Sequence, residues 1–192
     1  ASDNTAVGKS ALAANTTGTL NTAIGQNAGA AITTGIRNTT VGAASLDAEV
    51  AGHYSTAMGY GALSVQSNSS STDVYNTAVG YLAGAVVTTG VNNTFIGGLS
   101  GDANTTGGAN TSVGMSALTA NTTASNNTAV GKSALTANTT GDTLVAVGVN
   151  ALAANTTAAD NVAVGVNALF TNTTGASNTA MGKDALKANT TG

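Results

Sequence analysis

Eleven glycine residues occupy the same position of a unit of 17 residues that is repeated along this chain. They are Gly8, Gly25, Gly42, Gly59, Gly80, Gly97, Gly114, Gly131, Gly148, Gly165 and Gly182. Every interval is 17 residues except the step from Gly59 to Gly80, which contains four more. A fixed period of this length is typical of solenoids and other repeat architectures. The period therefore predicts one array over residues 1–192, in which each unit contacts only its neighbours.

The unit has the consensus N-T-A-V-G-x-x-A-L-x-A-N-T-T-G-x-x and is first complete from Asn4 to Leu20. Its copies start near residues 4, 21, 38, 55, 76, 93, 110, 127, 144, 161 and 178. The first five positions alternate small and β-branched residues and end in glycine, which predicts a short strand followed by a turn. The glycine suits a backbone position with positive φ, where a Cβ atom is penalised.

The rest of the unit is expected to close the coil. Most copies carry Ala-Leu after the glycine, whereas Gly29, Gly84 and Gly101 replace the leucine in three copies. We expect this segment to be extended, with a single helical turn as the alternative, because six residues do not separate the two. The closing Asn-Thr-Thr-Gly is expected to form a second corner.

The predicted fold is all-β, a parallel β-solenoid or β-roll of about eleven 17-residue coils. With strands ~4.8 Å apart, eleven coils would rise roughly 50 Å. Equivalent asparagine and threonine side chains are expected to form ladders on the outer surface. The four extra residues lie within residues 65–75, where Gln66 to Asp73 replaces the usual corner. We interpret them as a surface loop, with a ligand-binding loop as the alternative.

The composition suggests that one coil needs a partner. Aromatic residues make up 3% of the chain and tryptophan is absent, so an isolated coil of Ala, Val and Leu would bury little apolar area against its ordering entropy. In Leu144-Val145-Ala146-Val147 the usual Asn and Thr become Leu and Val, and a strand that is apolar on both faces is expected to be covered on both. Together with Phe95, these residues (Leu144, Val145 and Val147) are predicted to form a seam between the coil and a second chain.

The N-T-A-V-G and N-T-T-G repeats resemble the repetitive shafts of bacteriophage tail-fibre proteins over essentially the whole chain. They are also similar to the left-handed parallel β-roll heads of trimeric autotransporter adhesins, whose motif N-S-V-A-I-G has a counterpart at Asn4 to Gly8. The resemblance implies a homotrimeric fibre, with a left-handed coil favoured, on a virion or cell surface. It also implies that the array is a segment of something longer.

Charge and residue content argue against several functions. Charged residues make up 7% and the net charge is −3, so the basic footprint that nucleic acid requires is missing. No apolar run approaches the ~20 residues that span a bilayer. Cysteine is absent and His53 is the sole histidine, so we expect no cofactor, no metal site and no enzyme. We interpret His53, and the close pair Asp47 and Glu49, as residues of solvated corners.

Three functions remain from the sequence. The first is a structural shaft of an extracellular fibre, a phage tail fibre or surface adhesin that provides reach and display. The second is a module that binds a cell-surface glycan or host surface through its Asn and Thr ladders. The third is an ice-binding solenoid, suggested by the column Thr5, Thr22, Thr39 and Thr56, which Val145 and Val162 interrupt.

Twelve asparagines also satisfy the N-glycosylation pattern N-x-[ST]. They are Asn15, Asn38, Asn68, Asn92, Asn104, Asn110, Asn121, Asn126, Asn138, Asn155, Asn172 and Asn189. A repeated turn sequence explains the same pattern without any glycan.

Overall fold

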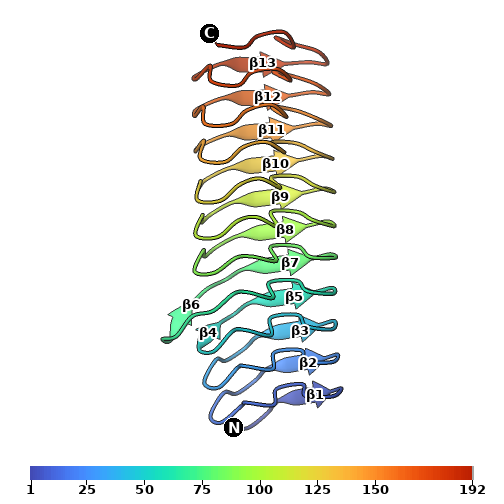
Figure 1. The fold of residues 1–192 in the computed structure, drawn as a ribbon, viewed down its shortest axis with the longest axis vertical. Coiled ribbons are helices and arrows are strands. Elements are labelled where there is room, and N and C mark those ends of the chain that lie inside the picture. Colours follow the sequence, from blue (N-terminus) through green and yellow to red (C-terminus); the bar gives the residue numbers. More distant parts are fainter. Residues whose placement is uncertain (192) are drawn as a thin grey trace.

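The computed structural model describes residues 1–191 and is a parallel β-solenoid, in which ten turns of about 17 residues join eleven short strands (Figure 1). Residues 1–191 contain no helix. The predicted all-β solenoid is therefore confirmed. We number the coils 1 to 11 from the starting residues given above, so that coil 3 is 38–54, coil 4 is 55–75 and coil 5 is 76–92.

One strand per coil builds the main sheet. Its members are β1 (Thr5–Val7), β2 (Thr22–Ile24), β3 (Thr39–Val41), β5 (Thr56–Met58), β7 (Thr77–Val79), β8 (Thr94–Ile96), β9 (Thr111–Val113), β10 (Thr128–Val130), β11 (Val145–Val147), β12 (Val162–Val164) and β13 (Thr179–Met181). Neighbours pair in parallel with consensus positions aligned, as in Thr5 with Thr22 and Val7 with Ile24. The sheet thus keeps the register of the repeat, and the extra residues of coil 4 leave it unchanged.

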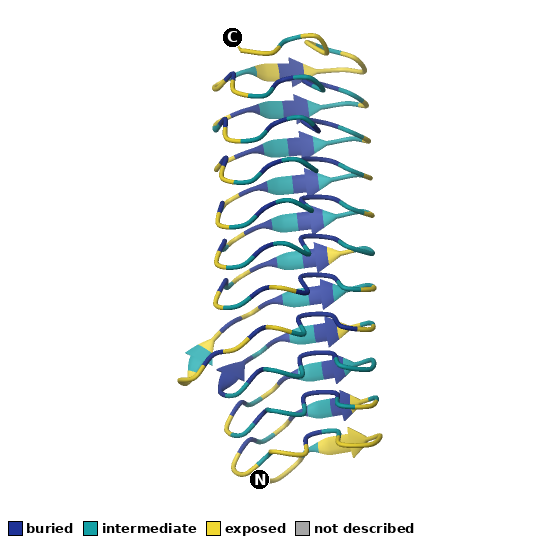
Figure 2. Cartoon of the chain, viewed as in Figure 1, coloured by how far each residue is buried: buried dark blue, intermediate teal, exposed yellow. Residues whose placement is uncertain are grey.

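Each strand turns one residue inward and two outward. The central residue, usually alanine, is buried, while the flanking threonine and valine are partly exposed (Figure 2). This alternation is expected of a strand, because successive side chains point to opposite faces. The outer face of the main sheet therefore carries a threonine column and a column of Val, Ile or Met along the whole solenoid.

The segment after each glycine is neither extended nor helical, so both sequence interpretations of it were wrong. It is a run of turns in which two residues per coil adopt left-handed φ, such as Ser133 at 57° and Leu135 at 53°. A left-handed non-glycine residue is disfavoured, by roughly 1 kcal/mol or more. Leu135 is fully buried, so its conformation brings an apolar side chain into a coil too narrow for a second strand.

The three glycines that replace leucine make room for larger side chains. Phe95 takes the inward position that is usually alanine and is fully buried. A Cβ atom on Gly84 would lie 2.7 Å from the Phe95 ring, and one on Gly101 would overlap the same ring. Gly29 is similarly placed against Ile32, at 2.9 Å. The coil thus keeps its cross-section by exchanging volume between positions.

Asparagine side chains hold the inside of the coil. The Asn93 Nδ2 donates to the carbonyl oxygen of Gly107 at 2.9 Å, and its Oδ1 accepts the backbone N–H of Asn110 at 3.0 Å. Asn110 repeats both bonds, to Ala124 at 2.9 Å and from Asn127 at 3.0 Å. Each side chain therefore ties together two corners of its own coil and also the next coil.

A second internal ladder runs through the Asn-Thr-Thr-Gly corner. The Nδ2 of Asn121 donates to Oδ1 of Asn104 at 2.7 Å, and Asn138 and Asn155 continue the ladder at 3.2 and 2.9 Å. These asparagines are fully buried. The ladders that the sequence placed outside are therefore internal as far as asparagine is concerned, and that expectation was wrong.

The strand glycines set how closely coils approach. Gly114 has a φ of +138°, and a Cβ atom there would lie 2.7 Å from the carbonyl carbon and oxygen of Gly131 in the next coil. Gly98 has no atom within 4 Å of its Cβ direction and no positive φ. The two glycines differ in space and in backbone conformation, although both follow a strand.

We expect Gly114→Ala to destabilise the solenoid by about 3 kcal/mol or more, because the alanine must relieve both the clash and the strained φ. Gly98→Ala is the matched control and should change stability by less than about 0.5 kcal/mol. Urea denaturation followed by circular dichroism measures both. Equal stability of the two variants would contradict the close stacking of the glycine corner.

Candidate functional site

The irregular part of the solenoid is the stretch from residue 37 to residue 82. It contains the sole histidine and all four tyrosines of the chain, together with Arg37 and Glu49, which are the only arginine and the only glutamate. The four extra residues fall in the same stretch. We call this stretch the irregular region and take it as the candidate functional site, because elsewhere the coils repeat with few changes.

Glu49 lies inside the coil and is fully buried, so its placement on a solvated corner was wrong. Its Oε1 accepts the backbone N–H groups of Val50, Ala51, Gly52 and Asn68 at 2.8–3.2 Å. Its Oε2 accepts side-chain N–H groups from Gln66 and Asn68, both at 2.8 Å. Six donors thus compensate the buried charge, which would otherwise be costly. Both oxygens are saturated, so Glu49 supports the fold and does not serve as an acid, base or ligand.

The extra residues are more than a surface loop. Gln66 is fully buried and Asn68 nearly so, because both bind Glu49. Further on, β6 (Thr72–Asp73) pairs in parallel with β4 (Gly52–His53) in a separate two-stranded sheet beside the main stack (Figure 1). The interpretation as a drifted loop is corrected: the insertion widens one corner and anchors it through internal hydrogen bonds.

His53 is 8% exposed and links three coils. Its Nδ1 accepts the backbone N–H of Ile36 at 3.1 Å, and its Nε2 lies 2.7 Å from the Ser71 hydroxyl. Since Nδ1 is an acceptor, a neutral ring carries its proton on Nε2 and donates to Ser71. The corner position was predicted, but the burial and the two hydrogen bonds were not.

Two pairs of stacked tyrosines lie on consecutive coils of the irregular region. Tyr54 and Tyr75 have ring centroids 5.0 Å apart at an interplanar angle of 10°. Arg37 extends this stack from the coil before, with its guanidinium 5.6 Å from the Tyr54 ring and its Nη1 donating to the Tyr54 hydroxyl at 2.9 Å. Cation–π and stacking contacts of this kind stabilise by roughly 0.5–1.5 kcal/mol. Desolvation, followed by the neighbouring charge of Asp73, raises the pKa of Tyr75.

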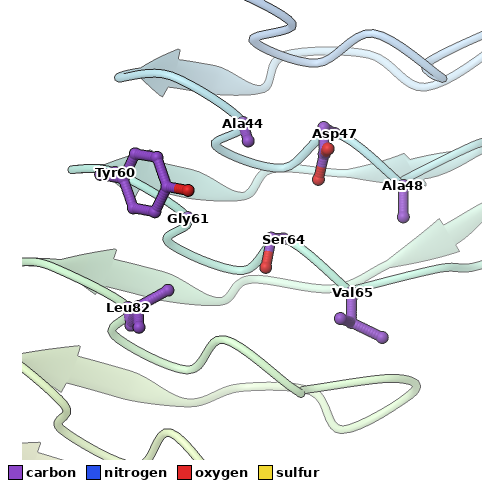
Figure 3. Close-up of a pocket in the computed structure, with 8 residues that line it drawn as sticks. All are labelled: Ala44, Asp47, Ala48, Tyr60, Gly61, Ser64, Val65 and Leu82. Atoms are coloured by element: carbon purple, nitrogen blue, oxygen red, sulfur yellow. The ribbon is translucent and has the colours of Figure 1, made fainter.

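The second pair, Tyr60 and Tyr81, borders a groove. Their rings are 5.7 Å apart at 14°, and each side chain is 57% exposed. The groove is an open hollow of about 410 Å³, lined by Ala44, Asp47, Ala48, Tyr60, Gly61, Ser64, Val65 and Leu82 (Figure 3). Desolvation by its surroundings raises the pKa of Asp47, although hydrogen bonding to its own backbone opposes the shift.

The four residues predicted to form a seam fall into two groups. Leu144 and Phe95 are fully buried within the chain's own coil, where Leu144 takes the place of a ladder asparagine. The Leu144 N–H still donates to Asn127 Oδ1 at 2.9 Å. Val145 and Val147 lie on the outer face of β11 and are partly exposed. Only these two valines are therefore placed where a second chain could contact them.

The asparagines of the glycosylation pattern are mostly internal. The buried members are Asn38, Asn68, Asn104, Asn110, Asn121, Asn138, Asn155 and Asn172. Their amide groups have no room for a glycan in this fold, and in most of them Nδ2 donates a hydrogen bond. Asn15 and Asn189 are partly buried, whereas Asn92 and Asn126 are exposed.

No group of three or more His, Cys, Asp or Glu residues suited to a metal ion occurs in residues 1–191. Within the same residues, no helix long and apolar enough to cross a membrane is present. Comparison with protein-family models, with curated proteins and with solved structures finds no match for the chain.

We expect Glu49→Gln to destabilise the solenoid by about 2 kcal/mol, because one carboxylate oxygen becomes an amide that faces donor groups. Asp47→Asn removes a carboxylate two residues away that lies at a groove edge, and it should leave stability unchanged or slightly raised. Thermal unfolding of both variants measures the difference. A Glu49→Gln protein as stable as Asp47→Asn would contradict the role of the buried carboxylate.

Proposed function

We propose that this chain is a shaft segment of an extracellular fibre, a phage tail fibre or surface adhesin, which provides mechanical reach and display. The stacking of eleven strands in one register supports this role. Each coil is joined to the next by backbone and asparagine bonds, so the solenoid behaves as a rod of neighbouring units. The proposed location is a virion or cell surface, in line with the resemblance to fibre shafts.

The observation that carries the proposal is an apolar column on the outside of the main sheet. At the last position of each strand stand Val7, Ile24, Val41, Met58, Val79, Ile96, Val113, Val130, Val147, Val164 and Met181. None of them is buried, and the most exposed are Val7 at 56% and Met181 at 74%. A strand face made of β-branched residues gains stability when a partner covers it.

The proposed partner is the chain itself, in a homotrimer that further copies extend into a longer filament. Three copies around one axis bring three such columns together and close the assembly. In coils 9 and 10 the outer threonines also become valine, Val145 and Val162, so we place the most apolar part of the interface there.

Sedimentation equilibrium tests the trimer. We expect the wild-type chain to have about three times its 18.2 kDa monomer mass, and the double variant Val147→Asp, Val164→Asp to be monomeric. Thr123→Asp with Thr140→Asp, at exposed corner positions, is the charge-matched control and should remain trimeric. Circular dichroism verifies that all variants are folded. A monomeric wild-type protein, or a trimeric valine variant, would contradict the proposal.

An ice-binding surface is a second candidate. The outward threonine column is half-exposed and aligned from coil to coil, as in Thr5 with Thr22 and Thr39 with Thr56. Thermal hysteresis in the monomer or trimer would favour this function over the shaft. The glycan module based on asparagine ladders is not proposed, since those side chains are internal.

A further inference from the structure

We propose that the groove of coils 3 to 5 is a binding site for one pyranose ring of a neutral glycan. The hollow measures about 410 Å³, within the range of ~300–1,000 Å³ typical of ligand pockets. It is open along one side, so a ring within a longer chain could enter it (Figure 3). The proposal is independent of the shaft role and does not require a trimer.

The hollow exists because two side chains are small where other coils carry longer ones. The position two residues after the strand glycine holds Ser10, Asn27, Ala44, Gly61, Leu82, Leu99, Ser116, Ser133, Asn150, Asn167 and Asp184. Only coils 3 and 4 have alanine and glycine there. A Cβ atom on Gly61 would lie 2.6 Å from the Leu82 side chain, so Leu82 folds over the glycine and closes one end of the hollow.

An aromatic ring forms one wall. Tyr81 stacks on Tyr60 from the following coil, while the equivalent residue of the preceding coil is only Ala43. The other face of the Tyr60 ring therefore lacks a large neighbour from that coil. A pyranose presents a face of C–H groups that packs on such a ring by dispersion and burial of apolar area.

Polar atoms surround the same space. The Asp47 carboxylate and the Tyr60 hydroxyl both extend towards the hollow, on either side of Gly61 (Figure 3). Ser64 Oγ donates to the Ala85 carbonyl oxygen at 3.2 Å and keeps its lone pairs for a further donor. Sugar hydroxyls both donate and accept, so they match a carboxylate, a phenol and a serine hydroxyl together.

The remaining features favour a neutral ring over a cation. An organic cation is best held by several aromatic rings, whereas one ring face borders this hollow. Leu82 and Val65 supply apolar contact at the other edges. Partial burial raises the pKa of Asp47, which shows that water solvates the carboxylate poorly. Hydrogen bonds from sugar hydroxyls would replace that missing solvation.

The test uses methyl β-D-glucoside, methyl β-D-galactoside and N-acetylglucosamine as probes. Saturation-transfer NMR and chemical-shift titration of the intact chain measure binding. We expect at least one probe to bind and to shift the signals of Tyr60 and Leu82. Tyr60→Ala should weaken that binding at least tenfold.

A second variant fills the hollow without changing the backbone. Ala44 already has a left-handed φ of 52°, and Leu82 and Leu99 adopt the same conformation at this position, at 52° and 57°. Ala44→Leu should therefore fold and abolish binding. Ser133→Leu makes the equivalent change in coil 8, far from the groove, and should bind as the wild type does.

Three results would overturn the proposal. The first is that none of the three probes binds at millimolar concentration. The second is that a probe binds equally well to wild type, Tyr60→Ala and Ala44→Leu, since the site would then lie elsewhere. The third is that choline, tested in parallel, binds through Tyr60 while the sugars do not, because the groove would then be a cation site.

Discussion

The internal asparagine bonds are the interaction on which the rest of this structure depends. A coil of 17 residues with one three-residue strand leaves most of its backbone outside the sheet, and those polar groups must find partners inside a narrow tube. The buried amide of each ladder asparagine supplies both a donor and an acceptor in the same place. An apolar residue fills the space, as Leu144 does, but offers neither group. The repeat is therefore conserved within the chain at asparagine as strictly as at glycine.

Much of the fold could be predicted from the sequence. The spacing of the glycines defined the coil, and the Thr-Ala-Val alternation gave the strand and its inward residue. The direction of the asparagines could not be inferred, because Asn is equally typical of exposed turns and only the closed coil shows that both corners face inward. The left-handed leucines were also missed, since leucine carries no signal for positive φ. The paired changes at Gly84, Phe95 and Gly101 could have been recognised as an exchange of volume between neighbouring coils.

The candidate site was predicted less well. The insertion was located, but its buried partner Glu49 was assigned to solvent, because a lone carboxylate is rarely internal. Six N–H donors from two coils make the exception, and no local pattern predicts such a long-range set. The clustering of rare residues was the signal available from sequence: the only His, Arg and Glu and all four Tyr lie within 37–82. A regular rod with one irregular region fits a molecule that combines reach with one local binding surface.

Hydrogen exchange of the asparagine side-chain amides tests the central claim most directly. The account predicts that the Nδ2 protons of Asn93, Asn110 and Asn127 exchange slower than those of exposed Asn92 and Asn126 by a factor on the order of 100 or more, because only global or local opening exposes them. NMR of the folded chain resolves both groups in one sample. Exchange of all five amides at the same solvent-exposed rate would show that the asparagines do not hold the coil together.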